Sequence, residues 1–578
     1  MCGIFGTICV SGCKYKDTIN NIKISHKKLK HRGPDWDGEF ENDKVFLAHH
    51  RLSIIDPLGG SQPLVWTNKK TGKVMVLCVN GEIYNHKTLK QELDKDMKKI
   101  GSECFNYTTN SDCEVVLALY QSWLNNGCKD RLENVLDKLD GMFSFILYDE
   151  ENEKFLVVRD HMGITSLYYG YDKYGNLHIS SEMKAFSQDT VPKHFPAGHY
   201  IFADIECKGV PILKKYFSVM DYDVDKIKQL DNFSNNVLDL YSLGIRERLL
   251  SAVEKRLQCD VPFGMLLSGG LDSSLICSLA KQVLKDKNQS WNPSMMKTFS
   301  IGLEGSPDLA AAQKVADFLQ TEHYNFTFTI EEGLNAIRDV INHLETYDVT
   351  TIRASTPMFL LARRIKSLGV KMVLSGEGSD EIFGGYLYFL NAPNDKQHSE
   401  ECIKRVNALP LFDNLRANKS TMAWGVEARV PFLDKRVVEL GLNMPSILKR
   451  NRNIEKWILR KAFDIKCLNG ECKFLPDELL WRQKEQFSDG VGYSWIDKLK
   501  EVAEDKVSDY MLSLSEFRYP YNTPKNKEEY YYRTIFDEIF TGMGSKYTVE
   551  KWVPRTDWDG VGYDPSGRAQ GTHVAKYS

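Results

Sequence analysis

The sequence predicts two domains of different fold class, with antiparallel sheets in the N-terminal part and a doubly wound parallel α/β sheet in the C-terminal part. The chain has 578 residues, whereas ~100–200 residues are typical of one domain. Up to about residue 210, short apolar runs flank turn residues, which is typical of hairpins. Beyond it, short apolar runs alternate with helical patterns, which favours parallel strands.

The N-terminal elements are predicted from these runs. A helix is expected after Ser111, because Ser111-Asp112-Cys113-Glu114 has the form of a capping signal. Acidic or Gly-containing turns separate two pairs of strands and predict two hairpins. The expected strands are 45–48, 74–79, 141–148 with 154–158, and 168–171 with 177–180, and the expected helices are about 17–31 and about 112–126.

The C-terminal elements follow from the alternation of strand and helix patterns. Each apolar run is too short for a helix, and the patterns between them have helical length. The expected order is strand 262–267, helix 273–285, strand 298–303, helix 308–320, helix 357–368 and strand 370–374. Helical and loop patterns then continue to the end of the chain.

A polar, acidic stretch at 219–240 separates the two parts and is interpreted as the linker. We therefore expect a first domain at 2–205, a linker at 206–240, a second domain at 241–555 and a C-terminal tail at 556–578.

Composition excludes several classes of protein. With 75 basic and 78 acidic residues the net charge is −3, which argues against a partner that is a nucleic acid. The 13 cysteines are scattered without a CxxC pair, so neither a zinc ribbon nor a disulfide framework is indicated and a reducing compartment fits. No secretory signal pattern and no apolar run near the ~18–20 residues of a membrane span is present. We expect a cytoplasmic, cytosolic protein without membrane contact.

Cys2 is a candidate nucleophile. If Met1 is removed, Cys2 carries both a thiol and a free α-amine, whose ordinary pKa of about 7.7–8.0 suits a general base. Gly3 lets a substrate approach the backbone closely. A chance cysteine at a processed terminus is the alternative, so the choice depends on the other motifs.

A Gly-rich loop and an acidic loop in the C-terminal part are candidate phosphate and metal sites. Ser268-Gly269-Gly270-Leu271-Asp272-Ser273-Ser274 lies between a strand and a helix, where backbone N–H groups attract phosphate oxygens. It is not a Walker A loop. Ser375-Gly376-Glu377-Gly378-Ser379-Asp380-Glu381 follows the strand 370–374, at the edge where open α/β sheets bind ligands. Asp272 and Asp380 are the carboxylates expected to bind Mg²⁺.

The N-terminal motifs together resemble the glutaminase domain of N-terminal-nucleophile glutamine amidotransferases over about residues 2–205. The resemblance rests on Cys2-Gly3-Ile4-Phe5-Gly6, His31-Arg32-Gly33-Pro34-Asp35, Arg51-Leu52-Ser53-Ile54-Ile55-Asp56, Asn80-Gly81-Glu82-Ile83-Tyr84-Asn85 and Asp112, in that order. It implies an αββα sandwich of antiparallel sheets. It also implies that Cys2 attacks the glutamine amide, with the Asn80 side chain and the Gly81 N–H as the oxyanion hole.

The same resemblance implies how glutamine is bound. Arg51 would bind the α-carboxylate of glutamine through its planar guanidinium, and Glu82 and Asp112 would receive the α-ammonium. Taken singly, each of these residues is more often structural.

The Gly-rich loop resembles the pyrophosphate loop of ATP pyrophosphatases. With the glutaminase motifs in one chain, the sequence resembles the glutamine-hydrolysing asparagine synthetases over nearly its whole length, including Arg416 to Ser420, Gly425 to Asp434, Trp481 to Gly490 and Asp564 to Gln570. The resemblance implies that Glu377 deprotonates the attacking ammonia and that Lys484 stabilises the adenylation transition state. The residues implied to bind ATP are Leu267, Ser268, Gly269, Gly270, Asp272, Ser273, Ile301, Ser375 and Gly376.

The implied reaction consumes ATP, aspartate and glutamine and yields asparagine, glutamate, AMP and pyrophosphate through a β-aspartyl-AMP intermediate. Mg²⁺ is the expected cofactor, a homodimer is a family-level expectation, and an apolar passage for ammonia is expected from Cys2 towards Ser375.

Three other functions would require different residues. A different amidotransferase would lack the loop 268–274, and a β-lactam-forming relative would not need an intact Cys2 and glutamine pocket. A non-catalytic sensor would have broken catalytic groups, yet Cys2, Asn80, Asp272, Glu377 and Lys484 are all present.

Overall fold

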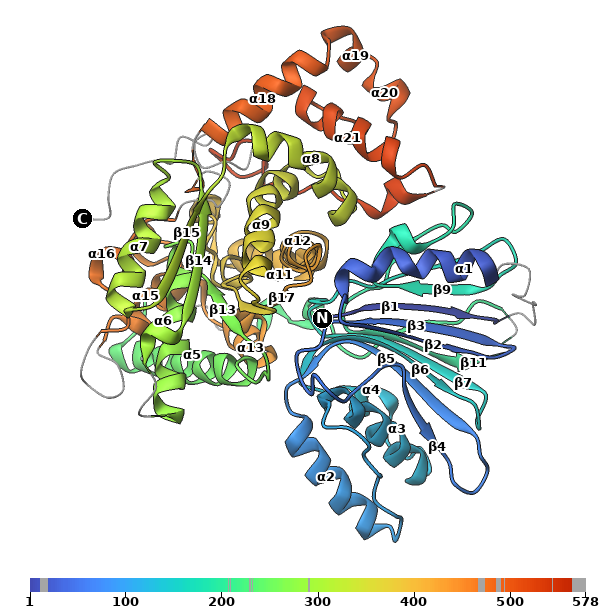
Figure 1. The fold of residues 1–578 in the computed structure, drawn as a ribbon. Coiled ribbons are helices and arrows are strands. Elements are labelled where there is room, and N and C mark those ends of the chain that lie inside the picture. The colour runs from blue at the N-terminus through green and yellow to red at the C-terminus, as the bar shows by residue number, and fades with distance from the viewer. Residues whose placement is uncertain are drawn as a thin grey trace.

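The computed structural model confirms the predicted fold class, with antiparallel sheets in the N-terminal half and a parallel sheet with helices in the C-terminal half (Figure 1). The structure describes residues 1–10, 19–205, 207, 209–227, 230, 232–288, 292–465, 473–484, 490–492, 494–542 and 544–563. The expected helical residues 17–18 and most of the expected tail, 564–578, lie outside this part of the chain.

The N-terminal half contains two six-stranded sheets. The first has the order β10-β8-β9-β1-β3-β2, built from β1 (Gly3–Ile8), β2 (Trp36–Glu41), β3 (Val45–Arg51), β8 (Tyr168–Tyr171), β9 (Leu177–Ser180) and β10 (Lys193–His194). The second has the order β12-β11-β7-β6-β5-β4, built from β4 (Leu64–Thr67), β5 (Val74–Ile83), β6 (Gly141–Asp149), β7 (Lys154–Arg159), β11 (His199–Asp204) and β12 (Leu213–Lys215). Both expected hairpins, β6–β7 and β8–β9, are antiparallel pairs.

The two sheets pack face to face. Ile4 and Ile8 of β1 share a buried cluster with Val76 and Cys78 of β5, because alternate residues of each strand point to the same face. The next residues along β5, Leu77 and Val79, pack instead with helices on the outer face of the second sheet. Both faces of β5 are therefore covered, which explains why this strand reads as a continuous apolar run.

In the described part of this half, the α-helices are α1 (Ile19–Ser25), α2 (His86–Lys99), α3 (Val115–Asn125) and α4 (Leu132–Leu136). Figure 1 shows α1 over the first sheet and α2 to α4 below the second, which is an αββα arrangement. The expected helix at 112–126 begins as a 3₁₀ turn at Asp112–Glu114, and the Ser111 side chain accepts a hydrogen bond from the Cys113 N–H at 3.3 Å. The cap is present, although its partner is one residue earlier than in a capping box.

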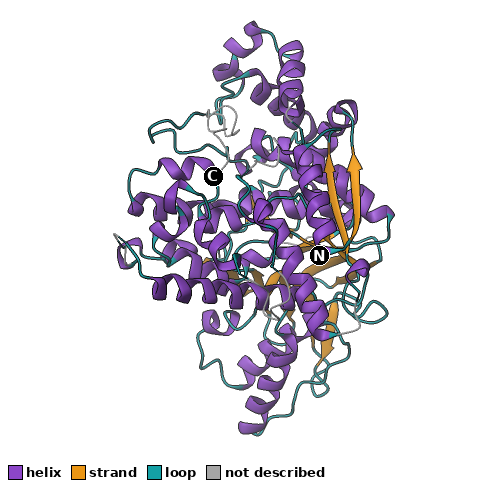
Figure 2. Cartoon of the chain, turned by 90° about the vertical axis from the view of Figure 1, so that its left-hand side faces the viewer, coloured by secondary structure: helices purple, strands orange, loops and turns teal. Residues whose placement is uncertain are grey.

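The C-terminal half is built on a five-stranded parallel sheet of order β15-β14-β13-β16-β17. Its strands are β13 (Phe263–Leu266), β14 (Lys297–Gly302), β15 (Glu322–Thr327), β16 (Met372–Leu374) and β17 (Glu427–Arg429). Helices α5 (Asn235–Arg256), α6 (Leu271–Lys287) and α7 (Pro307–Leu319) pack with one face, and α8 (Ile330–Leu344) and α9 (Val349–Ser367) with the other. Figure 2 shows that helices make up most of the side of the molecule that this half turns to the viewer.

Two element boundaries differ from expectation because of side-chain caps. Helix α9 begins at Val349 rather than near 357, since the Asp348 carboxylate accepts a hydrogen bond from the Thr351 N–H at 2.8 Å. Helix α5 begins at Asn235, inside the stretch expected to be linker, after Ser234 caps it. The two edge strands, β15 and β17, were not predicted, because one is half-exposed and the other has only three residues.

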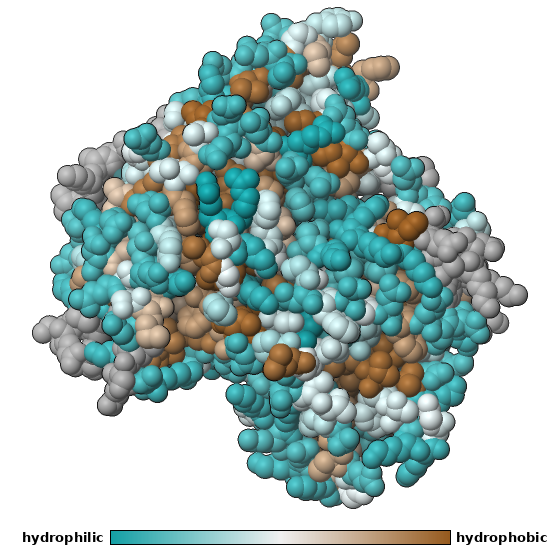
Figure 3. Space-filling view, in the orientation of Figure 1, coloured by the Kyte–Doolittle hydropathy of each residue, from teal (hydrophilic) through white to brown (hydrophobic). Residues whose placement is uncertain are grey.

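The remaining α-helices of the described residues come after β16 in the chain, three of them before β17. They are α10 (Ser379–Phe383), α11 (Asp395–Ala408), α12 (Asp413–Met422), α13 (Lys435–Leu442), α14 (Ser446–Lys449), α15 (Trp457–Phe463), α16 (Asp477–Leu480), α18 (Ser494–Lys506), α19 (Asp509–Ser513), α20 (Ser515–Arg518) and α21 (Lys527–Ile539). Among the described residues, no helix has the length and apolar content that crossing a membrane requires. Hydrophilic side chains cover much of the face in Figure 3.

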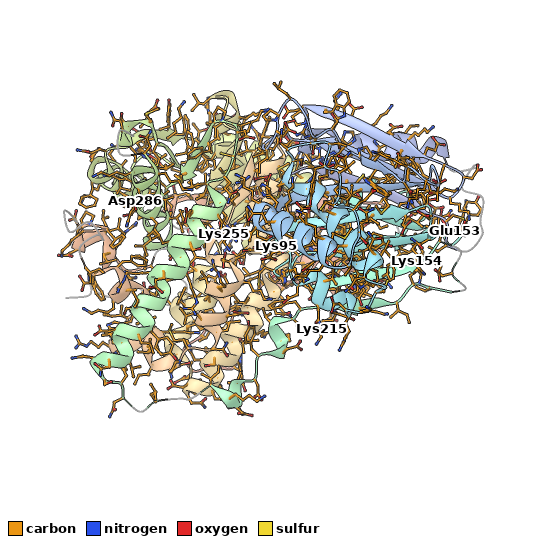
Figure 4. The ribbon with its side chains drawn as sticks, turned by 90° about the horizontal axis from the view of Figure 1, so that it is seen from below. Lys95, Glu153, Lys154, Lys215, Lys255 and Asp286 are labelled. Atoms are coloured by element: carbon orange, nitrogen blue, oxygen red, sulfur yellow. The ribbon has the colours of Figure 1, made fainter. Side chains whose placement is uncertain are left out.

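Ion pairs and hydrogen bonds join the two halves. Glu345 pairs with Lys419 at 2.5 Å within the C-terminal half, and its carboxylate also accepts the Met183 N–H of the N-terminal half at 2.9 Å. The Lys255 ammonium on α5 donates to Asp140 at 2.6 Å, and Figure 4 shows Lys255 where α5 meets the N-terminal half. A buried charge is stable only when it is paired, so these pairs favour one arrangement of the two halves.

Truncating Ile146 tests the face-to-face packing of the two sheets. Ile146 lies in the middle of β6 and is fully buried in the cluster between the sheets. Ile146→Ala should lower the free energy of unfolding by about 2–5 kcal/mol, because it leaves a cavity. Guanidinium denaturation followed by tryptophan fluorescence measures the change.

The matched control is Ile24→Ala, since Ile24 is 64% exposed on α1. This change should stay within about 0.5 kcal/mol of the parent. Equal effects at the two positions would contradict the packing described.

Candidate active sites

Cys2 lies at the start of β1, in the junction between the halves. It is buried, its N–H donates to Asn80 Oδ1 at 2.6 Å, and its carbonyl accepts from Arg32 Nε at 2.9 Å. Burial raises the pKa of the Cys2 thiol above its ordinary value. A Cβ on Gly3 would lie 2.9 Å from Leu29 Cβ, so β1 needs a glycine there to approach this neighbour.

Asn80 and Gly81 sit beside Cys2 at the end of β5. Asn80 is fully buried, and within the described chain its Nδ2 has no hydrogen-bond acceptor. Such an unpaired donor is costly unless a ligand uses it. Gly81 has φ of +139°, and a Cβ there would lie 1.9 Å from the Met142 carbonyl. The structure thus brings together three of the predicted site residues, with a spare donor next to the thiol.

The predicted glutamine-binding acids also converge here. Glu82 and Asp112 are buried, and Asp112 Oδ2 accepts the Ile83 N–H at 2.6 Å. Burial, reinforced by Asp112, raises the pKa of Glu82 to about 7. Burial likewise raises the pKa of Asp112 above its ordinary value, which hydrogen bonding to Ile83 opposes. Two buried acids side by side are poised to receive a cation.

The Arg51 guanidinium holds the loop that follows β3. It donates to the Ile55 carbonyl at 3.0 Å, to the Asp56 carbonyl at 2.8 Å and to the Gly59 carbonyl. An arginine has five N–H donors, so these three bonds leave donors for a carboxylate. The loop bonds fix the orientation of the side chain.

Met1 occupies the space next to Cys2. Its side chain is buried, and its ammonium pairs with Glu427 of β17. With Met1 attached, the nitrogen of Cys2 is an amide that donates to Asn80 and cannot act as a base. The predicted nucleophile and base therefore exist together only after Met1 is removed.

The second candidate site lies at the carboxyl ends of the parallel strands. The loop after β13 leads directly into α6. Gly269 has φ of +76°, and a Cβ there would lie 2.4 Å from the Ala312 N, so only glycine permits this turn. The Ser268 and Ser273 hydroxyls are 3.0 Å apart, at an α-helix N-terminus of the kind that binds anions.

One cavity gathers nearly all the predicted residues of this site. Those that line it are Leu267, Ser268, Gly270, Asp272, Ser273, Ile301, Ser375, Gly376, Glu377, Asp380 and Lys484. Gly269 is the exception, and its carbonyl accepts a hydrogen bond from Arg482 Nη1 at 3.1 Å. The residues come from four separate segments, and the strand order of the sheet places them together.

Two lysines balance the acids of the cavity. The buried Lys456 ammonium lies 2.6 Å from both Asp272 and Asp380, and Lys484 lies 2.8 Å from Asp380. Although burial opposes it, these lysines lower the pKa of Asp380 well below its ordinary value. The same carboxylates outweigh burial and raise the pKa of Lys484. Asp380 and Lys484 are therefore both charged at neutral pH.

Glu377 stands apart from this group and pairs with Arg416 of α12. The two are 2.6 Å apart, and Arg416 also pairs with Asp413 at 2.7 Å. Burial raises the pKa of Glu377 although Arg416 opposes the shift. A raised carboxyl pKa improves its ability to take a proton near neutral pH.

Sequence reasoning missed Lys456 and Arg416, which line the same cavity. Neither belongs to a Gly-rich or acidic motif, and each lies far along the chain from its partner. Arg416 begins a stretch, 416–420, that was matched by resemblance but given no role. For Lys456 the sequence contains no signal that we can identify.

The donor set fits Mg²⁺. Within the described chain Asp272 Oδ1 is buried and accepts no hydrogen bond, and Asp272 and Asp380 share Lys456. Mg²⁺ commonly takes one or two carboxylates together with substrate phosphates. No group of three or more acidic, histidine or cysteine ligands occurs among the described residues, so phosphate oxygens and water would have to complete the shell.

Removing the Lys456 charge tests the electrostatics of the cavity. Lys456→Met leaves Asp272 and Asp380 facing each other, which should destabilise the fold by about 3 kcal/mol at pH 7. Because the folded pKa of Asp380 is depressed, its contribution is present above the unfolded pKa of about 3.9 and is lost as pH falls. Thermal denaturation at pH 7 and at about pH 2 should therefore show a smaller difference from the parent at the lower pH.

Lys461→Met on the same helix is the control, because Lys461 is about one-third exposed and should change stability little. A pH-independent loss in Lys456→Met would show that packing rather than charge is responsible.

Family models and curated relatives agree on one assignment. The glutamine amidotransferase domain model matches residues 1–201, and the asparagine synthase model matches 244–404 and 391–558. "Asparagine synthetase B [glutamine-hydrolyzing]" of Escherichia coli is 46% identical over 601 aligned positions, covering all of both chains. "Probable asparagine synthetase [glutamine-hydrolyzing]" of Schizosaccharomyces pombe is 49% identical over 95% of each chain, and its Dictyostelium discoideum counterpart is 46% identical over all of both. The chain belongs to the family of glutamine-hydrolysing asparagine synthetases.

Proposed function

We propose that this chain performs the reaction of its family, ATP-dependent synthesis of asparagine from aspartate with glutamine as nitrogen donor, through the two sites described above. The observation that carries the proposal is the presence of both sites in one packed molecule. A buried thiol lies beside an unpaired amide donor, and a separate cavity combines a glycine loop, two acids and two lysines.

The first site would release ammonia from glutamine. After removal of Met1, the Cys2 amine takes the thiol proton and the sulfur attacks the side-chain amide of glutamine. Asn80 Nδ2 and the Gly81 N–H stabilise the oxyanion. The C–N bond then breaks, ammonia leaves with the proton, and water hydrolyses the glutamyl thioester to glutamate.

The glutamine backbone would be bound by opposite charges. The remaining donors of Arg51 bind the α-carboxylate, and Glu82 and Asp112 receive the α-ammonium. The raised pKa of Glu82 falls once a cation lies next to it, so bound glutamine keeps Glu82 ionised.

The second site would activate aspartate. The β-carboxylate attacks the α-phosphate of ATP to form β-aspartyl-AMP, and pyrophosphate leaves. The loop from Ser268 to Ser273 binds phosphates, Leu267 and Ile301 hold the nucleotide, and Lys484 stabilises the charge of the transition state. Asp272 and Asp380 would hold Mg²⁺, which neutralises pyrophosphate when bound.

Glu377 would complete the reaction. Ammonia attacks the carbonyl carbon of β-aspartyl-AMP, Glu377 takes a proton from the attacking nitrogen, and AMP leaves. Arg416 orients the carboxylate through their contact at 2.6 Å.

We further propose the division 2–205, 206–240, 241–555 and 556–578, which the ranges of the two family models support. A cytosolic location and a homodimer stay predictions from composition and resemblance.

An apolar route for ammonia is supported by one continuous cluster of buried side chains from both halves. The cluster includes Met142 and Ile164 with Met422 and Val430.

Cys2→Ala separates the two proposed reactions. The variant should lose glutamine-dependent asparagine synthesis by at least about 10⁴-fold, as for a lost nucleophile. It should keep synthesis from added ammonia within about twofold, because the second site is unaltered. Asparagine, AMP and ADP are quantified by chromatography after incubation with ATP and aspartate.

Cys78→Ala, which removes another buried thiol of the same half, should retain both activities. Loss of ammonia-dependent synthesis in Cys2→Ala would overturn the division of labour, and ADP as product would overturn the second site.

The pKa of Glu82 predicts a pH-dependent KM for glutamine. Glu82 binds an ammonium only when ionised, and with a pKa of about 7 it is mostly protonated at pH 6. The KM for glutamine in glutamate release should therefore be up to about tenfold higher at pH 6 than at pH 8.

Glu82→Gln should raise this KM and remove its pH dependence, which distinguishes Glu82 from other titrating groups. Identical KM values for the parent at pH 6 and pH 8 would refute the assigned role.

A further inference from the structure

Arg429 is a buried arginine of β17 that contacts both halves of the molecule. Its Nε lies 2.6 Å from Glu427, and its Nη1 donates to the carbonyls of Arg256 and Gln258 at 2.8 and 2.7 Å. Its Nη2 lies 3.2 Å from Glu82 Oε2 in the N-terminal half. The three other polar partners of this guanidinium belong to the C-terminal half, and the ring of Tyr84, from the N-terminal half, has its centre 5.8 Å from the guanidinium carbon. In Figure 1 the N-terminus lies next to β17.

The contact between Arg429 and Glu82 differs from the other three. Within the described chain neither Arg429 Nη2 nor Glu82 Oε2 makes a hydrogen bond, although the two atoms are paired by charge. Both atoms are buried. One carboxylate lone pair and one guanidinium donor are therefore still available to a polar ligand at this position.

The backbone of Arg429 reaches the second site. β17 pairs in parallel with β16, with Leu374 opposite Arg429, and the Arg429 carbonyl accepts the Ser375 N–H at 2.8 Å. Ser375 is followed by Gly376 and Glu377, and all three line the ATP cavity. A Cβ on Gly376 would lie 2.8 Å from the Ser273 N, so a shift of this loop would also move it against the phosphate loop.

One residue thus has its side chain at the glutamine pocket and its carbonyl at the ATP cavity. The α-ammonium of glutamine would bring a second cation to Glu82. Arg429 would then be held by Glu427 and the two carbonyls of the C-terminal half, which fixes the position of β17. The same strand carries the hydrogen bond to Ser375.

We propose that Arg429 is a positioning residue that couples the two active sites, so that glutamine at Glu82 and nucleotide with aspartate beside Ser375 each strengthen the binding of the other. The inference rests on the glutamine pocket proposed above. Coupling between sites is reciprocal, so the two affinities change by the same factor.

Equilibrium binding tests the coupling without turnover. In a Cys2→Ala background, calorimetry measures the Kd of glutamine alone and with saturating α,β-methylene ATP, which cannot be cleaved, and aspartate. The analogue and aspartate should lower the Kd of glutamine by about fivefold or more. Adding Arg429→Lys should reduce this factor below twofold, because a lysine ammonium cannot serve four acceptors as the guanidinium does.

Arg256→Lys is the matched control. Arg256 is also buried and also stacks on Tyr84, at 4.8 Å, but pairs with Asp434 rather than with Glu82. It should keep the coupling factor. With Cys2 intact, Arg429→Lys should retain ammonia-dependent synthesis within about threefold, which a general loss of structure would not allow.

A second variant keeps the proposal testable if Arg429→Lys folds poorly. If Arg429→Lys lowers the melting temperature by more than about 10 °C, Glu427→Gln replaces it, since this change keeps Arg429 but weakens the contact that aligns its Nε. It should reduce the coupling factor as well. An unchanged factor in the variant that folds, or no coupling in the parent, overturns the proposal. Absence of any glutamine binding in the parent would instead refute the glutamine pocket, and the coupling with it.

Discussion

The arrangement of both sites depends on charged side chains that are buried where the two halves meet. Removing such groups from water is costly, so each must find an opposite charge or a hydrogen bond. Lys255 with Asp140 and Arg429 with Glu82 cross the junction. Separation of the halves would leave these charges unpaired. The cost of burial therefore favours one docking of the halves, and this docking places Arg429 beside Glu82.

The two sites use close backbone approach in the same way. Gly81 and Gly269 both have positive φ and both lie where a Cβ would collide with backbone atoms. Gly81 follows Asn80, whose side-chain amide is the unpaired donor beside the Cys2 thiol, and Gly269 precedes a helix N-terminus at the cavity. In each case the glycine lies in or directly after a strand that is paired on both sides. Such rigid support suits chemistry that requires atoms at fixed positions.

Much of the fold and most site residues could be predicted from the sequence, because glycine loops, strand–helix alternation and the Cys2 motif are local patterns. Three features could not. The start of α5 is hidden in a polar stretch whose helix depends on tertiary packing. β17 has three residues, two of them charged, so no apolar pattern marks it. Lys456 and Arg429 act through partners more than a hundred residues away, and only the folded chain brings these together.

Removal of Met1 would change the packing of the interior as well as the chemistry of Cys2. Its side chain fills buried space shared with Leu52, Ile164 and Met422, and its sulfur contacts Asn418 across the junction. Cleavage of this one residue would leave that buried space next to Cys2 unfilled, at the place where the proposed reaction would release ammonia. The carboxylate of Glu427 would lose its ammonium partner in the same step. In the chain that still carries Met1, the buried space next to Cys2 would thus be filled and the Cys2 nitrogen would be an amide. Cleavage by a peptidase would empty the space and free the amine in one step.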